Sequence, residues 1–93
     1  MSFSLLPVPS GSLSLEFEPQ DHAALKAAIE DIFGALQVTW SATLAEVKFG
    51  GEAFTYADEW DHPCLIASTP RGNTMLQALH ARLTADGGEF GRR

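Results

Sequence analysis

Apolar and polar residues first alternate along this chain and later recur at helical spacing. Residues 12–18 alternate strictly, a period of two that is typical of a half-buried β-strand. One face of this strand carries Leu13, Leu15 and Phe17. Pro19 ends the alternation, and Asp21 stands where a side-chain oxygen can accept hydrogen bonds from the first backbone N–H groups of a helix.

Two segments have the three- and four-residue spacing of an amphipathic helix. The first follows Asp21 and ends near Gly34, and the second begins at 69–70, or with Asn73 as a later cap, and ends at 87–88. The apolar stripe of the first helix consists of Leu25, Ala28, Ile29, Ile32, Phe33 and Leu36, and that of the second consists of Met75, Leu76, Leu79 and Leu83. A single stripe on each helix predicts that each buries one face.

The segment between the helices alternates as strands do, but its phase changes once. Val38, Trp40, Ala42 and Leu44 share one parity, whereas Ala45, Val47 and Phe49 share the other. A one-residue shift must occur near 43–45, through either a turn or a bulge, because every later side chain would otherwise exchange faces. We expect a bulged or tightly bent connection there.

Gly50-Gly51 is the clearest turn signal, because glycine adopts positive φ at both central positions of a two-residue hairpin. The turn predicts that Phe49 pairs with Glu52. The pairs that follow are Val47 with Phe54, Ala45 with Tyr56, Lys48 with Ala53, and Glu46 with Thr55. One face of the hairpin is then apolar and the other polar, which supports this register.

These elements predict an α+β fold. Residues 58–63 are expected to form an acidic loop, and the apolar run after it a short buried strand at about 64–68. The order β-α-β-β-β-β-α favours a two-layer sandwich, in which a mainly antiparallel sheet of four or five strands carries two helices on one face. We expect one domain, 1–93, with residues 1–11 as a flexible lead-in or edge strand and 88–93 as a flexible tail.

The charge and composition of the chain limit the classes of partner that it can bind. The net charge of −6 and the isoelectric point of about 4.8 make nucleic acid an unsuitable partner. Residues 1–61 hold ten acids and two bases and residues 62–93 two acids and four bases, a division that would permit head-to-tail self-association. The single Cys64, the absence of a basic start typical of a signal peptide and the lack of a long apolar run predict a soluble cytoplasmic protein that does not enter membranes.

The candidate chemistry lies between residues 58 and 64. The potential metal ligands there are Asp58, Glu59, Asp61, His62 and Cys64. They combine oxygen, imidazole and thiolate donors, but the chain supplies no second pair of ligands of the kind that structural zinc sites use. A solvated acidic turn is the competing interpretation. Residues 68–74 resemble an anion-binding loop before a helix, although ordinary capping explains them as well, and we expect no cofactor.

Trp60 lies among these acids, either covering the sheet edge or anchoring a partner. The interaction candidates are Trp60, Asp58, Glu59 and Asp61. The favoured hypothesis is a small non-catalytic protein-interaction domain, whose partner is either an unknown protein or a second copy in a homodimer. The alternatives are a small metal-dependent protein or enzyme that uses the 58–64 loop, and an acidic inhibitor or immunity-like protein that presents its carboxylates to a basic target.

Overall fold

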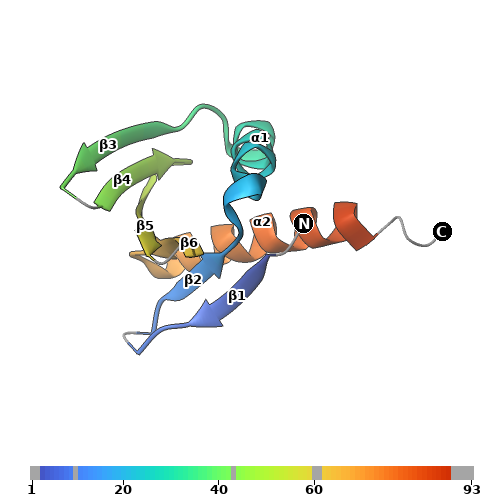
Figure 1. Cartoon of the computed structure of the whole chain (residues 1–93), viewed down its shortest axis with the longest axis horizontal. Coiled ribbons are helices and arrows are strands. Elements are labelled where there is room, and N and C mark those ends of the chain that lie inside the picture. Colours follow the sequence, from blue (N-terminus) through green and yellow to red (C-terminus); the bar gives the residue numbers. More distant parts are fainter. Residues whose placement is uncertain (1–2, 10, 43, 60–61, 89–93) are drawn as a thin grey trace.

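Six strands and two α-helices make up the part of the chain that the computed structural model describes, namely residues 3–9, 11–42, 44–59 and 62–88 (Figure 1). In chain order the elements are β1 (Ser4–Pro7), β2 (Leu13–Glu16), a 3-10 turn (Pro19–Asp21), α1 (His22–Phe33), β3 (Gln37–Ser41), β4 (Leu44–Phe49), β5 (Glu52–Glu59), β6 (His62–Ala67) and α2 (Pro70–Gly88). No helix within these residues is both long and apolar enough to span a membrane.

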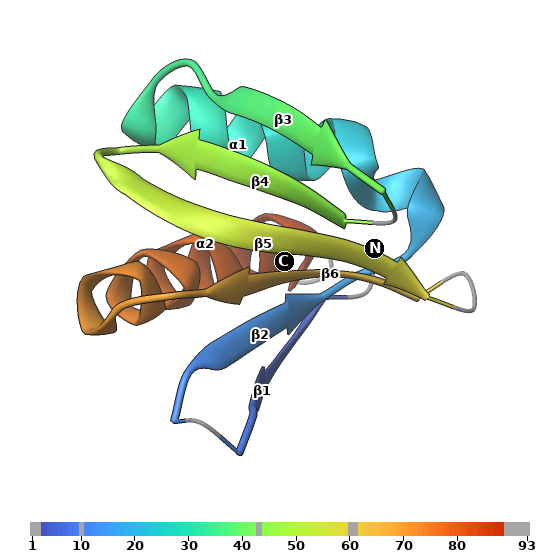
Figure 2. The same ribbon diagram turned by 90° about the vertical axis from the view of Figure 1, so that its left-hand side faces the viewer.

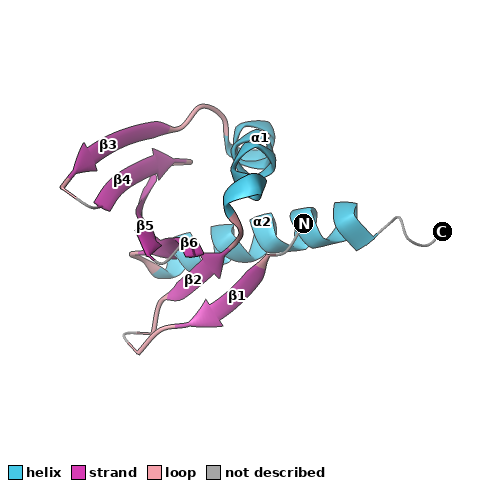
Figure 3. Ribbon diagram, viewed as in Figure 1, coloured by secondary structure: helices cyan, strands magenta, loops and turns pink. Residues whose placement is uncertain are grey.

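All six strands form one antiparallel sheet in the order β1-β2-β6-β5-β4-β3. The sheet curls, and both helices lie on its concave side, with α1 behind β3 and β4 and α2 behind β5 and β6 (Figures 2 and 3). The predicted α+β class is therefore confirmed. The predicted four or five strands become six because residues 4–7 pair along β2, with Leu5 opposite Leu15.

Glycine sets the register of the central hairpin. Gly50 and Gly51 have φ values of 60° and 82°, and the β4–β5 ladder has every predicted pair, from Phe49 opposite Glu52 to Ala45 opposite Tyr56. A Cβ atom on Gly50 would lie 2.5 Å from the Met75 Cε atom. The hairpin end therefore packs directly on α2.

The change of phase between β3 and β4 is a turn. Ser41 lies opposite Leu44, and Ala42, just after β3, has a φ of 52°, which is uncommon for a residue with a side chain. Because Val38 then lies opposite Val47 and Trp40 opposite Ala45, these four side chains share one face of the sheet. Leu44, which has the parity of Trp40, lies on the other face, so the phase changes before Leu44.

The predicted acidic loop at 58–63 is wrong in its extent. β5 continues to Glu59 and β6 begins at His62, so the ladder includes a pair of Asp58 and Pro63. Charged residues do not end a strand when the neighbouring strand still supplies backbone partners, as β6 does here. The predicted strand at about 64–68 is correspondingly longer, from His62 to Ala67.

The core lies between the concave face and the helices. All four predicted stripe residues of α2 are buried, as are Leu25, Ala28 and Ile29 of α1. Ile32 is 39% exposed, so the stripe predicted for α1 extends beyond the face that the helix buries. Gly34, with a φ of 94°, ends α1, and its N–H donates to the Glu30 carbonyl oxygen at 3.1 Å.

α2 begins at Pro70, the first of the two starts that the sequence predicted, whereas α1 lacks the expected side-chain cap. Asp21 occupies the N-cap position of α1, but its carboxylate makes no capping hydrogen bond to the described first turn. At α2, Thr69 is the cap, because its Oγ1 accepts the Gly72 N–H at 3.0 Å. Asn73 instead accepts the Leu13 N–H through Oδ1 at 2.8 Å, which ties α2 to β2. α2 continues to Gly88, and the rest of the predicted tail lies outside the described residues.

Truncating one buried and one exposed residue of the helical stripes tests which part of each stripe belongs to the core. Leu79→Ala removes a fully buried side chain and should lower the free energy of unfolding by about 3 kcal/mol. Ile32→Ala should lower it by about 1 kcal/mol or less, because that side chain is already partly in water. Urea denaturation of both variants measures the difference, and equal losses would contradict the assigned core.

Candidate functional site

The β3 edge of the sheet is exposed along its whole length. All five residues of β3 are exposed, with Val38 45% and Trp40 67% accessible. Among the described residues β3 pairs only with β4, and no charged residue stands in the sequence between Asp31 and Glu46. Sheet edges are usually protected by charges, prolines or covering segments, and β3 itself carries none of these residues.

An apolar pocket of about 220 Å³ lies between α1 and the concave face beside this edge. Its walls come from three places: the inner face of α1, the inward-facing residues of β3 to β6, and the segments that flank α1. The lining residues are Phe17, His22, Leu25, Lys26, Ile29, Leu36, Val38, Trp40, Val47, Tyr56 and Leu65. The exposed β3 side chains Val38 and Trp40 are thus one wall of the pocket.

Two polar side chains meet in the pocket. The Tyr56 hydroxyl lies 3.0 Å from His22 Nε2 and hydrogen-bonds to it. His22 is the first residue of α1, and Tyr56 faces inward because the Gly50-Gly51 turn fixes the register of β5. The Trp40 ring stands edge-on to Tyr56, with ring centroids 5.9 Å apart.

Burial raises the pKa of the Tyr56 phenol above its ordinary value, and the negative charges of Asp58 and Cys64 raise it further. Asp58 lies two residues along β5, on the same face of the strand. The phenol therefore stays neutral, and able to donate a hydrogen bond, throughout the physiological range.

Because Tyr56 is the only tyrosine, its ionisation is observable directly by absorbance at alkaline pH. Its pKa should lie above that of free tyrosine, and Asp58→Asn should lower it while leaving the larger contribution of burial. A folded-state pKa raised above the unfolded value means that stability is complete below the unfolded pKa and is lost as pH rises through the folded pKa. Glu46→Gln, the same charge change on the opposite face, is the control and should leave the Tyr56 pKa unchanged. A Tyr56 pKa that does not respond to Asp58→Asn contradicts the assigned electrostatics.

Of the sequence-predicted residues between 58 and 64, Asp58 and Cys64 are the ones whose side chains the structure describes, and these two do not come together. Asp58 lies opposite Pro63, whereas Cys64 lies opposite Ala57, so the ladder directs Asp58 and Cys64 to opposite faces of the sheet. Among the described residues no three His, Cys, Asp or Glu side chains are close enough to hold a metal ion. Trp60 and Asp61 lie outside the described residues. The side chains of Glu59 and His62 lie outside them too, so the metal and acidic-inhibitor hypotheses stay predictions.

The structure also brings forward residues that sequence reasoning passed over. The sequence patterns placed Trp40 and Val38 in a strand without a role and gave His22 no role. His22 is exposed in the structure, but its ring also contacts Tyr56. The missing signal was the β3–β4 register, because it brings the inward side of β3 next to Val47 and Tyr56. The absence of charged residues between Asp31 and Glu46 was visible in the sequence, and it could have indicated the unprotected strand edge.

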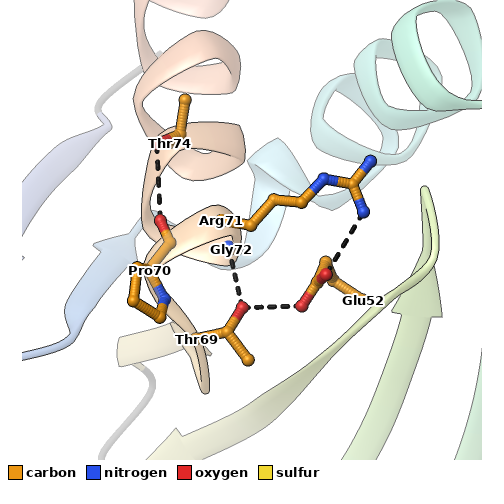
Figure 4. Close-up of polar contacts among 6 residues, drawn as sticks. All are labelled: Glu52, Thr69, Pro70, Arg71, Gly72 and Thr74. Atoms are coloured by element: carbon orange, nitrogen blue, oxygen red, sulfur yellow. Dashed lines mark hydrogen bonds and ion pairs between the residues drawn. The ribbon is translucent and has the colours of Figure 1, made fainter.

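The loop that resembles an anion site is already occupied by a carboxylate of the protein. Thr69 Oγ1 donates to Glu52 Oε1 at 2.6 Å, and Arg71 Nη1 donates to Glu52 Oε2 at 3.2 Å (Figure 4). Glu52 thereby places negative charge at the start of α2, where the helix dipole favours it. The Thr69 hydrogen bond is the main cause that lowers the Glu52 pKa, and Arg71 lowers it further against the opposing effect of burial.

Thr69→Val should raise the Glu52 pKa towards its ordinary value and weaken the α2 cap by about 1 kcal/mol. A lowered folded-state pKa adds stability above the unfolded pKa that is lost as pH falls through the folded pKa. The native chain should therefore lose stability more steeply than the variant as the solution is acidified through the range in which Glu52 titrates. Carboxyl NMR titration and urea denaturation across that range test this, and an unchanged Glu52 pKa would refute the assigned contact.

Comparison of the chain with protein-family models, curated proteins and solved structures finds no significant match. The function therefore has to be inferred from the chemistry of the β3 edge and the adjoining pocket.

Proposed function

We propose that this protein is a non-catalytic interaction module that docks a second copy of itself by strand addition at β3. The observation that carries the proposal is an exposed, uncharged edge strand whose inward-facing side chains are apolar. An added strand would extend the sheet through main-chain hydrogen bonds and continue its concave face.

The hydrogen-bond pattern of β3 suits a two-fold pairing. In a two-residue hairpin the residues that flank the turn form a hydrogen-bonded pair, here Ser41 and Leu44. By alternation Thr39 also directs its backbone groups to β4, whereas Val38 and Trp40 direct theirs to the free edge. An antiparallel pair of β3 strands centred on Thr39 therefore joins Val38 of each copy to Trp40 of the other. These pairs combine a β-branched and an aromatic side chain on one face, a favourable cross-strand combination.

Charge supports a second copy as the occupant. Each chain carries a net charge of −6, so two copies repel one another at most surfaces. The stretch between Asp31 and Glu46 is free of charge, so repulsion is weakest where the β3 edges meet. Such a two-fold contact would produce self-association without the head-to-tail charge pairing considered from the sequence.

The contact is small, and we expect a dissociation constant of roughly 10–100 µM. Sedimentation velocity from about tenfold below to about tenfold above that range should show a monomer–dimer equilibrium. Val38→Pro should weaken the dimer at least about tenfold, because it removes an outward N–H that β4 does not use. Val38→Ala, which keeps that N–H, should weaken it less.

Trp40→Lys is a second variant that does not depend on the direction of the backbone groups. Trp40 is 67% exposed, so the monomer should fold normally while the dimer is lost. Leu44→Lys is the matched control, because it adds the same charge at a 45% exposed site on the convex face and should leave the dimer intact. A chain that stays monomeric at every concentration, or equal effects of the two lysines, would overturn the proposal.

A further inference from the structure

We infer that the pocket between α1 and β3 is a ligand site for a small apolar monocarboxylate. This goes beyond self-association, because it concerns the interior of the pocket rather than the backbone edge. The apolar part of such a ligand would lie against the walls, and its carboxylate would lie beside His22, Lys26 and Tyr56, the polar residues of the lining.

The pocket has the size of one ring with a short chain. Its volume of about 220 Å³ exceeds the roughly 150 Å³ of an apolar cavity that holds benzene. The walls are almost wholly apolar: Trp40 contributes an aromatic ring, and Val47 and Leu65 contribute aliphatic side chains. A few convergent polar groups in an apolar hollow are the usual composition of a small-molecule site.

The polar residues of the lining determine which ligand charge the pocket favours. His22 and Lys26 are one turn apart on α1, so both project from the same side of the helix and both line the pocket. The Tyr56 hydroxyl meets His22 Nε2 at 3.0 Å and supplies a further hydrogen-bonding group. Among the described residues that line the pocket none is acidic, although the whole chain has twice as many acids as bases. A cationic or purely hydrocarbon ligand would leave this local positive charge unmatched, whereas a carboxylate complements it.

Two ligands that differ only at the polar end test this assignment. The probes are 4-phenylbutyrate and 4-phenylbutan-1-ol, whose binding is followed by NMR shifts of the His22, Tyr56 and Trp40 amides. The carboxylate should bind about threefold more tightly than the alcohol at low salt, and the preference should shrink as salt is added. Lys26→Gln should bring the two affinities within about twofold by weakening the carboxylate alone.

Lys48→Gln is the matched control. It removes the same charge, but Lys48 lies on the convex face next to Glu46, so the carboxylate preference should persist. Equal binding of the two probes to the native chain, no shifts with either probe, or equal effects of the two glutamines would overturn the inference. A chain that stays monomeric but retains the carboxylate preference would overturn only the proposed self-association. Conversely, a dimer without probe binding would overturn only the ligand site.

Discussion

The position of the β4–β5 hairpin depends on two glycines at its end. A side chain at Gly50 would require a positive φ, and its Cβ atom would displace the tip of Met75 on α2 and lie 3.2 Å from Phe33 Cδ1 on α1. Both helices thus close on the same turn, and the positive φ values of Gly50 and Gly51 set the register of the strands that leave it. Phe49 and Phe54 stack within this corner with centroids 4.3 Å apart. The inward direction of Tyr56, and therefore its contact with His22, follows from that register.

Two helices cover this curled sheet unevenly. α2 packs along β1, β2, β5 and β6, and its buried stripe fills that part of the concave face. α1 covers the other part, but it packs on α2 and leaves the inward side chains of β3 partly exposed. The pocket lies where this cover is incomplete, between α1 and the strands β3 to β6. The exposed edge and the pocket are therefore two consequences of the same packing.

The local patterns of the sequence predicted the elements well, because each rests on neighbours in the chain. The alternation of β2, the stripe of α2 and the Gly50-Gly51 register are of this kind. What the patterns could not supply were relations between distant elements. Asp58 belongs to a strand because β6 pairs with it, and the sequence does not show which strand pairs with which. His22 contacts Tyr56 only because the fold brings α1 next to β5. Ile32 fits the helical stripe, yet its exposure depends on where α1 lies over the sheet.

Trp40 belongs to both proposed sites, and this has a thermodynamic consequence. Its backbone belongs to the exposed edge strand β3, while its ring forms a wall of the pocket and stands edge-on to Tyr56. Docking of a second copy would bring a Val38 side chain against that ring, and a bound carboxylate would restrain the ring from inside. If the two sites are coupled in this way, linkage requires that the ligand change the dimer affinity by the same factor by which dimerisation changes the affinity for the ligand. An aromatic ring already held in place lowers the ordering cost of the second event, so the expected coupling is positive.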